Sequence, residues 1–208
     1  MKKEILEKIQ QLGGNIDNVK GNSLAEDLFS ITFDTVLYQR PEDTPWQTAE
    51  QAEPIYGIGE FINENEALFN TDKQTLYDKI IDKYFCLTRE GYGQVFWLPN
   101  LFTPFKEGTA DFEEWNDDFT DEETDLSEII KVTNDQTPDF IQVFYSYGFP
   151  DNYYICLSDP NPENPTLFGT DHEEFFREVT NEGSLEDFFN TFMTKEEVLE
   201  IVKKRIEK

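Results

Sequence analysis

One residue in the sequence has the chemistry of a general base at neutral pH. His172 is the only histidine among 208 residues, and carboxylates surround it in the segment Thr-Asp-His-Glu-Glu-Phe-Phe. A histidine with a carboxylate partner can activate a nucleophile, but no serine or cysteine stands in a recognisable nucleophile motif such as G-x-S-x-G. We therefore expect Asp171 and His172 to be structural residues that hold a turn. Catalysis by His172 with nearby carboxylates is the alternative.

The sequence does not match the usual motifs that bind cofactors or metal ions. A single histidine and two widely separated cysteines, Cys86 and Cys156, do not match the usual zinc-site patterns. We expect both cysteines to be buried free thiols. The Gly-x-Gly segments at 57–59 and 91–93 are too short for a phosphate loop and are interpreted as turns. The sequence therefore predicts no cofactor, no metal ion and no enzymatic activity.

The densest group of ionisable side chains is an acidic stretch. Residues 111–128 hold ten carboxylates in eighteen positions without a lysine or arginine, and Phe112, Trp115 and Phe119 lie among them. Spacings of three and four place these rings on one face of a short helix. Either the rings pack on the core and leave the acids in solvent, or at least one ring is exposed for binding. An EF-hand is excluded because its glycine and its alternating acids are missing, which leaves at most a weak cation site.

Net charge limits the classes of partner. Forty-four acidic residues against seventeen basic ones give a formal charge of −27, so nucleic acids and anionic membranes are excluded as direct ligands. A basic protein is the partner that this charge favours, and an acidic protein without an electrostatic role is the alternative. We predict that acids steer the partner and that a tryptophan anchors it, through a contact patch formed by Glu113, Glu114, Trp115, Asp117, Asp118, Asp121, Glu122 and Glu123.

Helices are predicted where apolar residues recur with helical spacing. Residues 3–12 follow this pattern before a glycine pair, and residues 72–84 follow it over three turns. Two further helices each begin at a capping box, in which a serine or threonine precedes an acid by three positions: Ser184 with Asp187, and Thr194 with Glu197.

Strands are predicted where β-branched and aromatic residues alternate or cluster. Residues 28–38 alternate and predict a strand, 86–99 and 139–157 predict two hairpins, and a short strand begins after the proline-rich loop at 159–165. Residues 39–53 are polar and contain prolines, which predicts a loop. Helices that bracket a run of antiparallel strands indicate the α+β class.

No repeat or linker divides the chain. We predict a single domain over residues 1–208, with an N-terminal elaboration at 1–70 and an acidic insertion at 107–128. The first residues alternate polar and apolar side chains and lack the continuous apolar segment of a signal peptide. No apolar run approaches membrane-spanning length, so a cytoplasmic location is expected.

The segment from Asp139 to Phe192 resembles the C-terminal half of the SUKH superfamily. The resemblance lies in the order of its parts: a strand, a glycine-containing turn, and an aromatic strand that ends in an Asp-Pro loop. A short strand then leads to Asp-His-Glu at 171–173, and Ser-Leu-Glu-Asp-Phe-Phe opens a helix. The helix with a Leu-Pro-x-x-Tyr-like motif and the Asn-Gly turn that usually precede these parts are not found in residues 1–138.

The resemblance implies a compact α+β domain whose twisted, mainly antiparallel sheet is wrapped by helices. It also implies a role as a bacterial immunity protein that binds and blocks a toxin, often a nuclease with a basic substrate surface. A strongly acidic inhibitor suits such a partner. The alternative that the same superfamily implies is a non-enzymatic regulatory or scaffold protein of the cell-wall synthesis regulator type.

Overall fold

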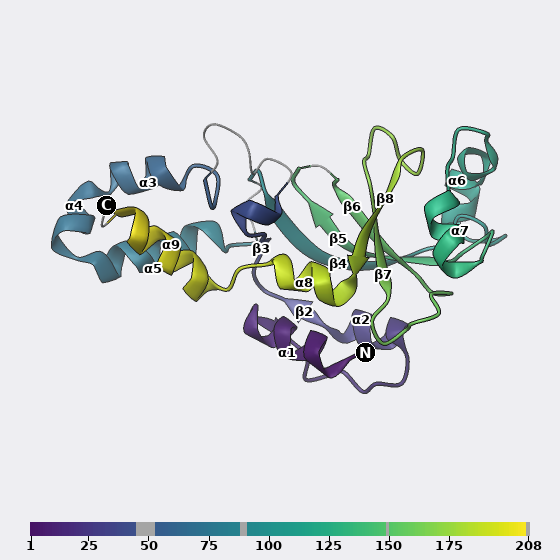
Figure 1. Cartoon of the computed structure of the whole chain (residues 1–208), viewed down its shortest axis with the longest axis horizontal. Coiled ribbons are helices and arrows are strands. Elements are labelled where there is room, and N and C mark those ends of the chain that lie inside the picture. The colour runs from purple at the N-terminus through teal and green to yellow at the C-terminus, as the bar shows by residue number, and fades with distance from the viewer. Residues whose placement is uncertain (45–52, 88–90, 149, 207–208) are drawn as a thin grey trace.

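The computed structural model describes residues 1–44, 53–87, 91–148 and 150–206, with only the backbone of residues 205 and 206. Within these residues the chain forms a single α+β domain, which confirms the fold class expected from the sequence. Helices lie at both ends and along one side of a central sheet (Figure 1). None of the helices in the described part of the chain is long and apolar enough to cross a membrane.

The centre of the domain is a six-stranded antiparallel sheet that curls into a half-barrel. Each strand pairs with its neighbour in the chain, so the sheet is a continuous meander. Register shifts in the β4–β5, β5–β6 and β7–β8 pairs mark bulges, which bend a sheet and strengthen its twist. In order, the strands are β3 (Leu37–Tyr38), β4 (Gln94–Phe102), β5 (Phe140–Ser146), β6 (Asn152–Cys156), β7 (Thr166–Thr170) and β8 (Val179–Ser184).

One face of the sheet carries the main hydrophobic core. Three helices cover this face: α1 (Lys3–Gln11), α2 (Leu24–Ser30) and α8 (Leu185–Thr191). Trp97 of β4 packs against Phe144 and Phe189, and its indole nitrogen donates to the carbonyl of Ile31 at 3.1 Å. A two-residue pair, β1 (Gly14–Asn15) with β2 (Thr32–Phe33), joins the helices of this layer. Amphipathic helices on one sheet face account for this core.

A second core forms at the end of the sheet beside β3. The helices there are α3 (Ile58–Glu64), α4 (Glu66–Thr71), α5 (Lys73–Tyr84) and α9 (Lys195–Ile206), which lie together on the left of Figure 1. Leu76, Ile80 and Val198 are fully buried between them. The short 3₁₀ helix η1 (Pro41–Asp43) follows β3 in the chain.

A third core lies at the opposite end of the molecule. Between β4 and β5 the chain forms α6 (Ala110–Thr120) and α7 (Ser127–Thr133), on the right of Figure 1. Buried rings of the sheet meet them there, among them Phe102, Phe140 and Phe168. Phe140 belongs to this core whereas Ile141 belongs to the main core, because successive side chains of a strand point to opposite faces.

Two strand predictions are wrong. The segment 28–38 is not one strand: it ends α2 and contains the short strands β2 and β3. Ser23 caps α2, because its hydroxyl accepts from the amide of Glu26 at 3.2 Å. The helix that starts at this cap includes Phe29, although the alternating pattern had placed Phe29 in a strand. The side chain of Phe29 is accordingly 45% exposed.

The hairpin predicted over residues 86–99 is wrong as well. β4 pairs with β3 and β5, while Cys86 forms only an isolated bridge with Thr35. Residues 88–90 of this prediction lie outside the described residues, as do residues 45–52 of the predicted loop. The hairpin over 139–157, the strand after the proline-rich loop and the four predicted helices are confirmed, whereas β8 was not predicted.

Candidate functional site

The acidic stretch forms a helix that is anchored by its aromatic residues. Thr109 caps α6, because its hydroxyl accepts from the amide of Phe112 at 3.2 Å. Phe119 is buried, and the ring of Trp115 packs on Phe175 with centroids 4.8 Å apart. Trp115 is half-buried and packs against the same core, and Phe112 is half-buried. For Phe119 and Trp115 the structure therefore favours the interpretation in which the rings pack on the core.

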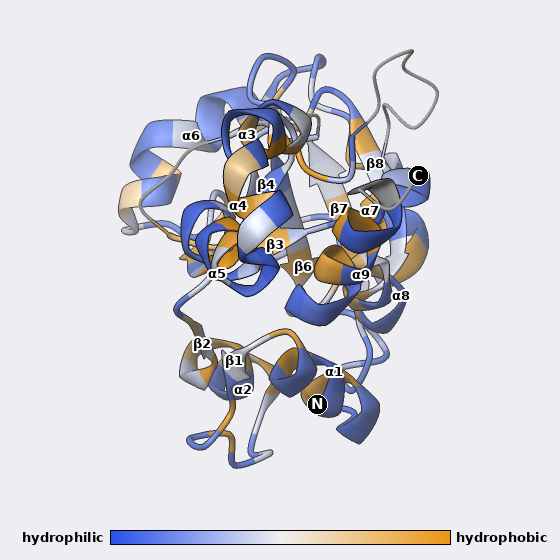
Figure 2. Cartoon of the chain, turned by 90° about the vertical axis from the view of Figure 1, so that its left-hand side faces the viewer, coloured by the Kyte–Doolittle hydropathy of each residue, from blue (hydrophilic) through white to orange (hydrophobic). Residues whose placement is uncertain are grey.

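The carboxylates of the same stretch lie on the surface. All seven acids of the predicted patch are exposed, and Figure 2 shows hydrophilic colour over much of α6. We call these residues the acidic face: Glu113, Glu114, Asp117, Asp118, Asp121, Glu122 and Glu123. Asp111 and Asp125 lie in the same stretch but outside the predicted patch, and their carboxylates accept from the backbone amides of Thr103 and Ser127.

The acidic face borders a pocket of about 180 Å³. Its lining combines Trp115 and Phe175 with acids of α6, of the turn after α6 and of the β7–β8 loop. In the described part of the chain, Arg177 is the only cation that forms an ion pair with the acidic face, through Glu123 at 2.7 Å. The pocket therefore already holds one guanidinium beside a carboxylate and an aromatic surface.

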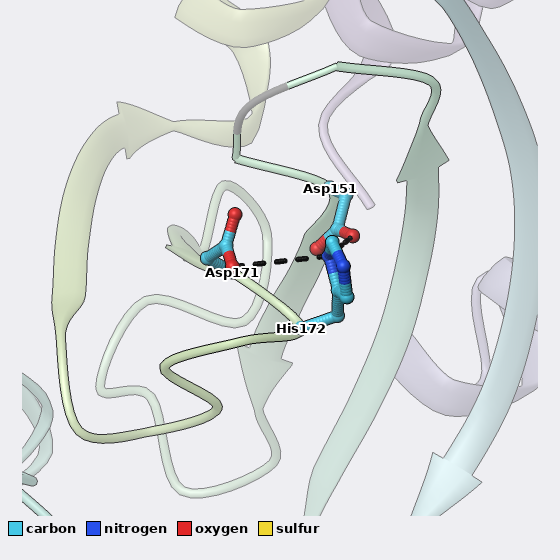
Figure 3. Close-up of side chains that lie close together, drawn as sticks. All are labelled: Asp151, Asp171 and His172. Carbon is cyan, nitrogen blue, oxygen red and sulfur yellow. Dashed lines mark ion pairs between the residues drawn. The ribbon is translucent and has the colours of Figure 1, made fainter.

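A second cluster lies between the β5–β6 turn and the β7–β8 loop. Figure 3 shows His172 beside Asp151, with Asp171 farther away to one side of both, and dashed lines mark the contacts of His172 with both aspartates. Its Nδ1 atom is 2.5 Å from Oδ2 of Asp151 and 3.8 Å from Oδ1 of Asp171. The strand register explains the approach: Asn152 of β6 pairs with Thr170 of β7, so the residues just beyond this pair are neighbours.

The surroundings of His172 are strongly negative. Asp151 raises the pKa of His172 above its usual value of 6.5, by its charge and by its hydrogen bond, and Asp171 and Glu173 add to this effect. The imidazole itself is exposed, with 68% of the side chain accessible, whereas Asp151 is buried. The result is an exposed histidine on a buried carboxylate, which ties the two loops together.

The two clusters differ in how far the sequence indicated them. The seven acids of the acidic face are exposed, as the acidic stretch predicted, and Trp115 is half-buried beside them. Asp171 and His172 lie in a turn, as expected, but their contact with Asp151 was missed, since these residues are twenty or more positions apart in the chain. The signal that could have found Asp151 is its place at the end of the predicted hairpin turn, beside the strand that leads to Asp171.

Comparison of the chain with protein-family models, with curated proteins and with solved structures gave no match.

Proposed function

We propose that this chain is a binding protein that neutralises a basic, nuclease-like bacterial toxin by direct association through its acidic face. The observation that carries the proposal is the acidic face itself: seven exposed carboxylates on a capped and aromatically anchored support. Of these, only Glu123 has an ion-pair partner among the described residues.

Rigid support makes these charges useful for recognition. Phe119 packs on Phe176 with ring centroids 4.8 Å apart, and Trp115 packs on Phe175, so α6 needs little ordering when a partner arrives. Unpaired surface carboxylates keep their full attraction for a basic surface, which accelerates encounter and favours basic partners over others. A pocket with an aromatic wall beside the face could receive a lysine or arginine side chain.

The family resemblance supports the choice of a toxin as partner. The segment that resembles the SUKH superfamily corresponds to β5, β6, β7, β8 and the capped helix α8. In that superfamily a bacterial member binds and blocks a toxin, and the proposal extends this role to the present chain. It acts in the cytoplasm in this proposal, where a nuclease would meet its substrate.

The proposal is tested by co-expression with the toxin encoded at the same locus. Wild-type protein should rescue growth and form a one-to-one complex whose affinity falls steeply between 50 and 500 mM NaCl, because screening removes the attraction between exposed charges. The variant D117N/D118N/D121N/E122Q removes four charges from the acidic face with little change in shape. We expect it to lose most of the rescue and to flatten the salt dependence.

A matched control removes the same number of charges elsewhere. Glu60, Glu64, Asp78 and Asp82 are exposed on α3 and α5, at the opposite end of the molecule from α6 (Figure 1). E60Q/E64Q/D78N/D82N should rescue growth like the wild type. Equal loss in both variants would assign the effect to net charge and not to the acidic face. Complete absence of rescue and of a complex would favour the regulatory or scaffold role.

A further inference from the structure

We propose that Asp151, Asp171 and His172 form a binding site for a divalent first-row transition-metal ion, with Zn²⁺ as its representative. Each residue offers one donor atom, and the three atoms lie within 4.8 Å of one another. They come from two loops that the sheet register brings together (Figure 3). The proposal is independent of the toxin-binding function and concerns a different set of residues.

The distances fit a site that adjusts slightly when an ion enters. Zinc binds nitrogen and oxygen ligands at about 2.0–2.2 Å, so the donors around a tetrahedral ion lie roughly 3.4 Å apart. Nδ1 of His172 is 2.5 Å from Asp151 and 3.8 Å from Asp171, so the first distance must lengthen and the second shorten. An exposed imidazole can make this movement without disturbing the core, whereas the buried Asp151 can stay in place.

The carboxylates are already oriented by hydrogen bonds. Oδ1 of Asp151 accepts from Asn152 at 2.7 Å, and Asn152 in turn accepts from Gln142 at 2.9 Å, which leaves Oδ2 directed at His172. Asp171 accepts from the amide of Glu173 at 2.6 Å. Outer-shell partners of this kind fix the direction of metal ligands and raise metal affinity.

The donor set selects the class of ion. One imidazole nitrogen with two carboxylate oxygens suits zinc and its neighbours in the first transition series, whereas Ca²⁺ and Mg²⁺ prefer sites built from oxygen alone. Two carboxylates balance the charge of a divalent ion. The exposure of His172 leaves room for water to complete the coordination.

The test uses the single histidine of the chain as its own reporter. Zn²⁺ is titrated into the full-length protein while the imidazole resonances are followed by NMR and the heat of binding is measured by calorimetry. We expect the His172 resonances to change with a stoichiometry of one ion per chain, and Mg²⁺ at the same concentration to leave them unchanged. H172A and D171N should each weaken Zn²⁺ binding at least tenfold. N152A, which removes the support of Asp151, should weaken it about tenfold.

Controls separate this site from unspecific attraction to an acidic protein. D117N/D118N/D121N/E122Q keeps all three proposed ligands, so its affinity for Zn²⁺ should equal that of the wild type. Because His172 is exposed, H172A is expected to fold normally, and circular dichroism verifies this. The proposal is overturned if Zn²⁺ leaves the His172 resonances unchanged or if H172A binds Zn²⁺ as tightly as the wild type.

Discussion

Phe176 combines full burial with a backbone conformation that large side chains rarely adopt. Its φ angle is 55°, and only 1% of its surface is exposed. A left-handed conformation costs about 1–2 kcal/mol for a residue with a β-carbon. The cost is offset by ring contacts, with centroids 4.8 Å from Phe119 and 5.1 Å from Tyr154, and by the hydroxyl of Thr170, which accepts from the Phe176 amide at 2.8 Å.

We therefore predict that F176A is one of the most destabilising substitutions at the α6 end of the molecule. The loss should be about 3–5 kcal/mol, as is usual when a buried aromatic side chain is removed, and urea unfolding measures it. F29A is the control, because Phe29 is 45% exposed, and it should change stability by no more than about 0.5 kcal/mol. Similar losses in both variants would show that the ring cluster does not hold α6.

Glu197, at the start of α9, makes a contribution to the stability of the fold that depends on pH. Burial alone would raise its pKa, but hydrogen bonds from the Thr194 amide and the Arg40 guanidinium lower the pKa below its usual 4.5. A carboxyl group with a lowered pKa stabilises the fold above its ordinary pKa, and this contribution is lost as the pH falls through the lowered value.

E197Q should therefore be less stable than the wild type at pH 7, and this difference should shrink as the pH falls through the lowered pKa of Glu197. Since the Glu197 side chain is 44% exposed, the difference at pH 7 is expected to stay below about 1 kcal/mol. Urea unfolding of both proteins from pH 3 to pH 7 measures the difference. E178Q is the control: Glu178 is exposed, so its stability difference from the wild type should not vary with pH in this way.

At the scale of elements, the sequence predicted those helices and strands whose caps and apolar patterns match the way they are buried in the structure. α5 has an N-cap in Asp72, which accepts from Thr75 at 3.2 Å, and fully buried residues one turn apart in Leu76 and Ile80. β5 and β6 are rich in β-branched and aromatic residues because both of their faces are covered. Pattern and structure agree in these elements.

Elements that depend on distant partners were not predicted. β8 has the sequence Val-Thr-Asn-Glu-Gly-Ser, which contains few strand-forming residues and follows no alternation. It exists because it pairs with β7. The Asp151–His172 contact has the same origin, since only the β6–β7 register brings these residues together. The acidic face was predictable because seven neighbouring charges cannot be buried at acceptable cost.

The β7–β8 pair has a position, Gly169, at which any β-carbon would be crowded by neighbouring side chains. A β-carbon on Gly169 would lie 2.8 Å from the Thr180 hydroxyl and 2.9 Å from a ring carbon of Pro150. We predict that G169A destabilises the protein by about 1–3 kcal/mol, as overpacking does. It should also accelerate amide hydrogen exchange in β7 and β8 more than in β4.

The control for this substitution is G91A. The nearest atoms to a β-carbon on Gly91 belong to Gln94 and lie 3.7 Å away, which is an ordinary contact. Stability should then change by no more than about 0.5 kcal/mol. Uniform acceleration of exchange over the whole sheet in G169A would contradict a local effect on the β7–β8 pair.

At the scale of the whole molecule, the two ends differ in charge. Lysines of α5 and α9 lie over aromatic rings, as Lys83 does over Phe61 at 4.3 Å and Lys203 over Tyr77 at 5.6 Å. The α6 segment has no basic residue of its own. In a molecule of net charge −27, a helix that carries acids and no basic residue adds to a negative field that attracts a basic partner.

The same charge distribution should limit stability at low ionic strength. Repulsion among exposed carboxylates acts over roughly 30 Å at 0.01 M salt but only about 8 Å at 0.15 M, so the melting temperature should rise as NaCl is added over this range. D117N/D118N/D121N/E122Q removes four charges from the acidic face. It should therefore melt at a higher temperature than the wild type in 0.01 M salt, and added NaCl should raise its melting temperature by less.

The substitutions in E60Q/E64Q/D78N/D82N should raise the melting temperature in 0.01 M salt by less. Lys79 and Lys83 lie on the same helix as Asp78 and Asp82 and already reduce the local repulsion. Differential scanning calorimetry of the three proteins over the salt range separates these outcomes. A melting temperature that falls with added NaCl would mean that ion pairs outweigh repulsion. In that case crowding of charge on the acidic face would not limit the stability of the fold, because the ion pairs of the described residues involve only Glu123 of this face.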